Sequence, residues 1–69
     1  MNTTISVSGM TCGHCVSSVK EELAEVPGVE SVTVDLHAGG VSPVTIESTR
    51  ELTSEEIAAA VEEAGYTVV

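Results

Sequence analysis

The chain has 69 residues, enough for one small domain and too few for an enclosed substrate cavity, so an elaborate enzyme is not expected. Hydrophobic residues make up 42% of it, which is enough for a packed core, and Tyr66 is the single aromatic residue. Only Lys20 and Arg50 offset eleven acidic residues, giving a formal net charge of −9. This balance excludes the basic surfaces that bind nucleic acid or an anionic membrane.

The first half of the chain predicts a strand, a helix and a second strand. Residues 3–8 alternate polar and apolar side chains, which is typical of a half-buried strand. Apolar residues then recur at helical spacing on one face: Val16, Val19, Leu23 and Val26. The pair Pro27-Gly28 is expected to end this helix. A second alternating strand follows, with its apolar positions at Val32, Val34 and Leu36.

The second half repeats this arrangement. Residues 37–43 are predicted to connect a hairpin, and residues 44–47 resume the alternation, with Pro43 best tolerated at a strand start or at a sheet edge. Residues 53–56 match a helix capping box. Apolar residues follow at helical spacing: Ile57, Ala60, Val61 and Ala64. Gly65 is expected to end this helix before a short final strand over residues 66–69.

The order βαββαβ predicts an α+β fold of the ferredoxin-like type. This fold is an open-faced sandwich, in which an antiparallel four-stranded sheet carries two helices on one face. Its topology brings the loop at Cys12, the hairpin at His37 and the turn at Gly65–Tyr66 to the same end. We therefore expect a single domain over residues 1–69, with its function located at that end.

Localisation is predicted from what the sequence lacks. The longest apolar run covers residues 57–61, far short of the roughly 20 residues that span a membrane. Residues 1–5 carry neither a basic nor an apolar leader segment, so no signal peptide is expected. The chain is therefore predicted to lie in the cytoplasm, without membrane insertion. The glutamates of residues 21–25 and 55–63 are predicted to form solvated helix faces.

Cys12 and Cys15, the only cysteines, form a C-x-x-C motif where the first strand leads into the first helix. A reducing cytoplasm disfavours a structural disulfide, and structural zinc and iron–sulfur sites usually need four ligands. Covalent haem attachment needs a histidine after the second cysteine, where Val16 stands. Two interpretations remain: a thiol redox pair, or a two-thiolate site for a soft metal such as Cu(I). A helix N-terminus favours the thiolate in both.

The run from Gly9 to Cys15, GMTCGHC, resembles the G-M-T-C-x-x-C signature of the heavy-metal-associated domain family. Residues 64–66, Ala-Gly-Tyr, resemble a matching segment of its bacterial members, and His14 is similar to the residue that copper chaperones of the CopZ type carry there. The resemblance extends over the whole chain. The hairpin at residues 39–43 is slightly long for the family, and the chain lacks the lysine patch of eukaryotic relatives.

The resemblance implies a cytosolic copper chaperone that is not an enzyme. One Cu(I) would be held by Cys12 and Cys15 and delivered to the metal-binding domain of a copper-transporting P-type ATPase. A copper-sensing repressor is a further implied partner, and a metal-dependent homodimer a further implied state. Two alternatives stay open, namely an isolated metal-binding domain of such an ATPase and a small thiol–disulfide oxidoreductase. The latter would commonly show an aromatic residue before the first cysteine, which this sequence lacks.

Four residues around the motif are singled out as well. Met10 is expected to be an apolar plug that anchors the loop, in preference to a thioether ligand. His14 neighbours Cys15 on the first helical turn, where adjacent side chains project about 100° apart, so it is expected to tune the thiols without ligating the metal. The resemblance suggests that Tyr66 covers the thiolates, the alternative being a tyrosine at the core edge. His37 is expected to be a solvated hairpin residue.

Overall fold

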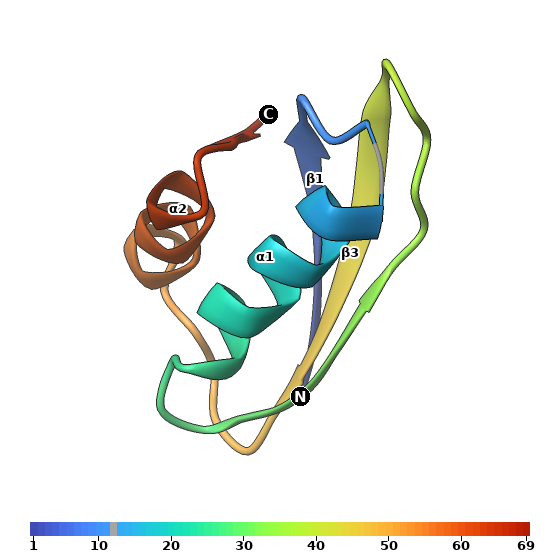
Figure 1. Ribbon diagram of the computed structural model, residues 1–69. Coiled ribbons are helices and arrows are strands. Elements are labelled where there is room, and N and C mark those ends of the chain that lie inside the picture. The colour runs from blue at the N-terminus through green and yellow to red at the C-terminus, as the bar shows by residue number, and fades with distance from the viewer. Residues whose placement is uncertain (12) are drawn as a thin grey trace.

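A computed structural model describes residues 1–11 and 13–69, so Cys12 lies outside the described residues. The chain forms strands and helices in the predicted order (Figure 1). The elements are β1 (Asn2–Ser8), α1 (Gly13–Ala24), β2 (Val29–Val34), β3 (Val41–Ser48), α2 (Ser54–Glu63) and β4 (Thr67–Val68).

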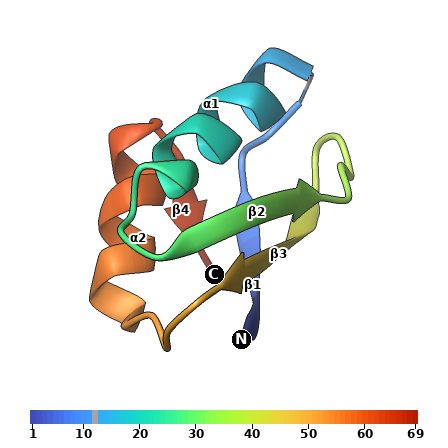
Figure 2. The ribbon, with the colours of Figure 1, turned by 90° about the horizontal axis from the view of Figure 1, so that it is seen from below.

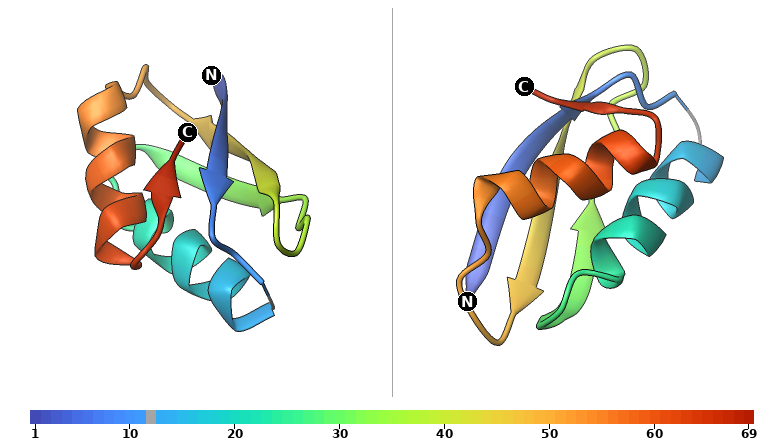
Figure 3. Two further views of the ribbon diagram at one scale, coloured as in Figure 1. Left: turned by 90° about the horizontal axis from the view of Figure 1, so that it is seen from above. Right: turned by 90° about the vertical axis from the view of Figure 1, so that its left-hand side faces the viewer.

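The four strands form one sheet in the order β2-β3-β1-β4, and every neighbouring pair is antiparallel. Since β1 and β2 both run antiparallel to β3, they point in the same direction. Both helices cover the same face of this sheet and leave the other face open (Figure 3). The structure thus confirms the predicted α+β, ferredoxin-like open-faced sandwich.

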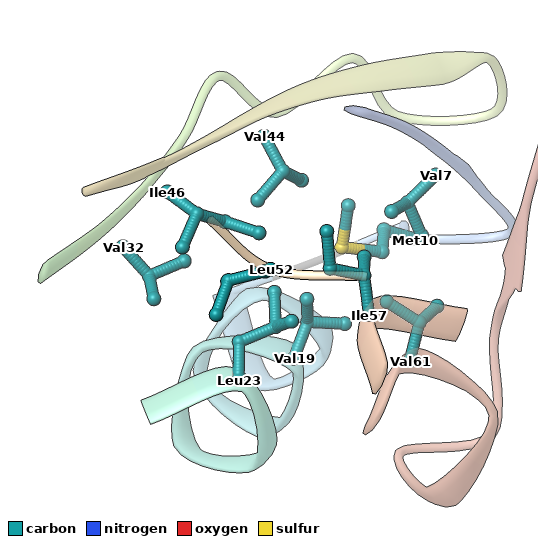
Figure 4. Close-up of a cluster of buried hydrophobic side chains, with 10 residues drawn as sticks. All are labelled: Val7, Met10, Val19, Leu23, Val32, Val44, Ile46, Leu52, Ile57 and Val61. Atoms are coloured by element: carbon teal, nitrogen blue, oxygen red, sulfur yellow. The ribbon is translucent and has the colours of Figure 1, made fainter. Parts of the chain in front are cut away.

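The core lies between the sheet and the two helices (Figure 4). Its buried side chains come from β1, β2, β3, both helices and two loops: Val7, Met10, Val19, Leu23, Val32, Val44, Ile46, Leu52, Ile57 and Val61. All of them are aliphatic or thioether side chains, because the chain has almost no aromatic residues. Met10 is the core residue supplied by the loop between β1 and α1.

The hairpin between β2 and β3 differs from the prediction. Strand β2 ends at Val34, so Leu36 lies in the connection and is 36% exposed, although it continues the apolar alternation. Strand β3 begins at Val41, which makes Pro43 its third residue in an interior strand, so the predicted start or edge position is wrong.

The position of Pro43 has a simple backbone explanation. Its carbonyl accepts a hydrogen bond of 3.0 Å from the backbone N–H of Asp35. In antiparallel pairs the N–H and C=O of one residue face the same neighbouring strand. The donor that proline lacks would therefore also face Asp35, one residue past the end of β2 at Val34. Pro43 thus removes no bond within the paired part of the sheet.

Both ends of α2 are closed by local hydrogen bonds. At its start, Thr53 and Glu56 form the predicted capping box. At its end, the backbone N–H of Gly65 donates to Glu62 and that of Tyr66 to Val61, at 2.9 and 3.1 Å. Gly65 has a φ of +95°, which a glycine adopts at little cost. The predicted glycine stop is therefore confirmed.

Figure 2 shows, from below, the end of the sheet where β1 begins and where the α1–β2 and β3–α2 loops lie. Arg50, in the second of these loops, connects them. Its Nε donates to the carbonyl of Pro27 at 2.9 Å, and its two terminal nitrogens donate to the carboxylate oxygens of Glu56 at 3.1 and 2.5 Å. Hydrogen bonds from Arg50, and then from Thr53, lower the pKa of Glu56 to about 2. We call this group the Arg50–Glu56 clasp.

Candidate metal centre

The strand register brings three loops together at one end of the sheet. Ser8, the last residue of β1, pairs with Val41 on one side and with Thr67 on the other. The loop after β1, the β2–β3 hairpin and the turn before β4 therefore begin or end at the same level, near the top of Figure 1. This confirms the predicted meeting of these three segments. We call it the thiol end.

Cys15 is the third residue of α1 and sits in its first turn. It is half-buried and packs against the core. Its sulfur lies 3.9 Å from the hydroxyl oxygen of Thr11, close enough for a hydrogen bond in which either atom donates. The first turn of a helix favours negative charge, which supports a thiolate at this position. Cys12, the other half of the predicted pair, lies outside the described residues.

Met10 fixes the loop that leads to the motif. Its side chain is fully buried and points into the hydrophobic cluster (Figure 4). A thioether in this position already has apolar side chains around it, so binding an ion at the surface would require it to leave the core. The burial is what an apolar plug requires; whether Met10 also affects a bound metal stays a prediction.

Tyr66 lies over the start of the same loop. It is half-buried at the edge of the core, and its ring approaches Gly9, where an added Cβ would lie 3.4 Å from Tyr66 Cδ1. Gly9 has a φ of +93°, a backbone conformation that residues with side chains rarely adopt. The glycine of the motif therefore lets the loop turn tightly beneath the tyrosine ring.

The two histidines are placed differently. His14 is the second residue of α1 and is exposed, next to a Cys15 that faces the core. This is the arrangement expected if the two side chains diverge on the first turn. His37 is exposed in the hairpin, with its Nε2 3.2 Å from a carboxylate oxygen of Asp35.

Sequence reasoning gave no role to Thr11 or Gly9. The signal for both was the motif itself, in which they flank Met10. Within residues 1–11 and 13–69, no three His, Cys, Asp or Glu side chains gather closely enough to hold a metal ion. A centre of three or more such ligands at Cys15 therefore needs Cys12 or another molecule to complete it. No helix in the described ranges is long and apolar enough to cross a membrane.

Comparison with known proteins gives consistent matches. The family described as heavy-metal-associated domain matches residues 4–67. The copper chaperone CopZ of Bacillus subtilis is 40% identical over 65 residues, covering 94% of this chain and 91% of the relative. A solved structure titled CopZ metallochaperone superposes with a TM-score of 0.85 at 33% identity and covers all of both chains. A copper-binding domain from a P-type ATPase has a TM-score of 0.78 at 29% identity, over 100% of this chain and 92% of that one.

Proposed function

The chain belongs to the heavy-metal-associated domain family, and from that premise we propose that residues 1–69 form a single cytosolic unit that acts as a Cu(I) chaperone. It binds one Cu(I) between the thiolates of Cys12 and Cys15. It passes the ion to the metal-binding domain of a copper-transporting P-type ATPase. Only the bonds between the protein and the copper ion form and break, so the protein is not an enzyme.

The observation that carries this proposal is the place of Cys15 in the first turn of α1, at the end where three loops meet. Cu(I) is soft and accepts low coordination, so two thiolates suffice where zinc would lack ligands. A site at the surface of a loop lets a thiol of a partner enter before the first thiolates leave. Such an exchange moves the ion without releasing it to water.

The partner is supported by likeness of fold. The P-type ATPase domain described above superposes on the whole of this chain, so two domains of the same shape would present their metal ends to one another. The same likeness supports a second candidate, in which this chain is itself the metal-binding domain of such a transporter. A copper-sensing repressor as a further acceptor, and a homodimer sharing the ion, follow from the same open site.

A competitive titration tests the site. The reduced protein is titrated anaerobically with Cu(I) against a strong chelator, beside Cys12→Ser, Cys15→Ser and the control Ser17→Ala, an exposed change on α1. We expect one Cu(I) per wild-type chain, no tight binding by either cysteine variant, and wild-type affinity in the control. Wild-type affinity in either cysteine variant would refute the proposed ligands. A disulfide potential typical of redox enzymes would favour an oxidoreductase.

The residues beside the pair have supporting roles in this proposal. Thr11 hydrogen-bonds the sulfur of Cys15, Tyr66 covers the loop, and Met10 anchors it. His14 contributes charge near the thiolates without binding the ion. Copper-edge X-ray absorption on the loaded wild type and on His14→Gln tests this last role. A nitrogen shell that disappears in the variant would show that His14 is a ligand.

A further inference from the structure

A groove runs between α2 and the end of α1 with the turn that follows it. It is open to solvent and has a volume of about 390 Å³. Figures 1 and 2 show that the two helices approach each other at this end of α1. Half of its lining residues are small or apolar: Val26, Pro27, Ala59 and Ala60. The other half are glutamates: Glu22, Glu25, Glu56 and Glu63. We call it the inter-helix groove.

Three of these glutamates, Glu22, Glu25 and Glu63, form no ion pair within the described residues. Glu56 is neutralised by Arg50 in the clasp. The other ion pair within the described ranges joins His37 to Asp35, away from the groove. The pKa of Glu22 is raised, first by a hydrogen bond with Glu25, then by burial and by repulsion from Glu25, Glu63 and Glu21. The groove therefore presents uncompensated negative charge beside an apolar lining.

The groove is separate from the thiol end. Glu22 follows Cys15 by seven residues on α1, and a helix rises about 1.5 Å per residue, so some 10 Å along the axis separates them. The other lining residues from this part of the chain, 25–27, follow the end of α1 and come later still in the sequence. The residues that line the groove include neither a cysteine nor a histidine. What binds here can therefore be distinguished from what binds at the thiols.

The chemistry of the groove selects the kind of occupant. Within residues 1–11 and 13–69 no three His, Cys, Asp or Glu side chains are close enough to hold a metal ion, so the carboxylates of the groove do not form a coordination site of three ligands. Several carboxylates beside an apolar strip match a peptide that carries both apolar and cationic side chains. Opposite charges steer such a partner and exclude acidic ones.

We propose that the inter-helix groove binds a basic amphipathic segment of a partner protein. An apolar side chain of that segment packs on Val26 and Ala60, while its lysines or arginines pair with Glu22, Glu25 and Glu63. Pairing with cations also relieves the repulsion among the three carboxylates. This interaction needs no metal and goes beyond copper carriage.

The test uses the reduced, metal-free protein and a labelled helical model peptide with leucines on one face and lysines on the other. Fluorescence anisotropy gives its affinity, and nitrogen–proton NMR spectra locate it. We expect shifts centred on the groove and weaker binding at higher salt. The variant E22Q/E25Q/E63Q should bind about tenfold more weakly, since it removes the three negative charges that pair with the cations of the peptide.

A charge-matched control separates a defined site from general attraction to an acidic protein. The variant E30Q/E47Q/E51Q removes three exposed carboxylates from β2, β3 and the loop after β3. We expect it to bind the peptide as the wild type does. Equal weakening in both variants, or shifts spread over the open sheet face, would overturn the proposal. Cu(I) affinity should stay unchanged in both, so failure here is distinguishable from failure of the chaperone proposal.

Discussion

Replacing Met10 separates a packing role from a metal-binding role. Met10 is fully buried, so Met10→Ala leaves a cavity in the core and should cost about 2–5 kcal/mol. A domain of 69 residues has a stability of about 3–10 kcal/mol, which makes this loss a large fraction of the total. A loss of about 3 kcal/mol corresponds to a fall in Tm of about 12–24 °C.

Met10→Leu is the matched control, because it keeps the volume and removes the sulfur. Its stability should stay within about 1.5 kcal/mol of wild type, and its Cu(I) affinity should be unchanged. Thermal unfolding followed by far-ultraviolet circular dichroism measures the first, and chelator competition the second. A tenfold loss of Cu(I) affinity in Met10→Leu would show thioether ligation. A Met10→Ala variant melting within about 5 °C of wild type would refute the packing argument.

Three further changes test other parts of the structure. Hydrogen bonds from Arg50, and then from Thr53, lower the pKa of Glu56 from 4.5 to about 2, so the ionised Glu56 stabilises the fold above pH 4.5 and this contribution is lost as the pH falls towards 2. Arg50→Gln should therefore reduce the fall in Tm over this pH range in a series of melting curves. The pKa of Glu22 is raised, so the protonated side chain stabilises the fold below pH 4.5 and this contribution is lost as the pH rises and Glu22 becomes charged. Glu22→Gln removes that charge, so it should raise Tm at pH 7 and leave Tm unchanged near pH 4. Gly9→Ala forces an unfavourable φ, so it should cost about 1–2 kcal/mol, and it places a methyl group against the ring of Tyr66, so it should alter the fluorescence of that single tyrosine.

The fold was predictable where its signals are local. The capping box at Thr53, the apolar stripe of each helix and the glycine stop at Gly65 all depend on residues within a few positions of one another. The ends of β2 and β3 were not, because Leu36 continues the alternation after the backbone has left the sheet. Where a strand ends depends on its partner, and the partner is distant in sequence.

The candidate site shows the same division. The motif predicted that Cys15 would stand at the start of a helix, and the structure places it there. The approach of Tyr66 to Gly9 joins residues more than fifty positions apart, and only the pairing of β4 with β1 brings them together. The contact between Thr11 and Cys15 depends on how the loop enters α1, which no periodic pattern encodes.

The two ends of the chain lie at different distances from the thiol end, and this difference decides where a probe can be attached. Met1 is held beside Ser48 at the opposite end of the sheet, whereas Val69 donates a backbone hydrogen bond to Ser6, two residues from the end of β1. Five residue steps of about 3.3 Å each lead from Met1 to Ser6, so the two chain ends lie some 16 Å apart along β1. A dye, purification handle or surface tether at the amino end would therefore lie away from the proposed metal centre. The same attachment at Val69 would lie close to the loops of the thiol end, where we propose that Cu(I) binds.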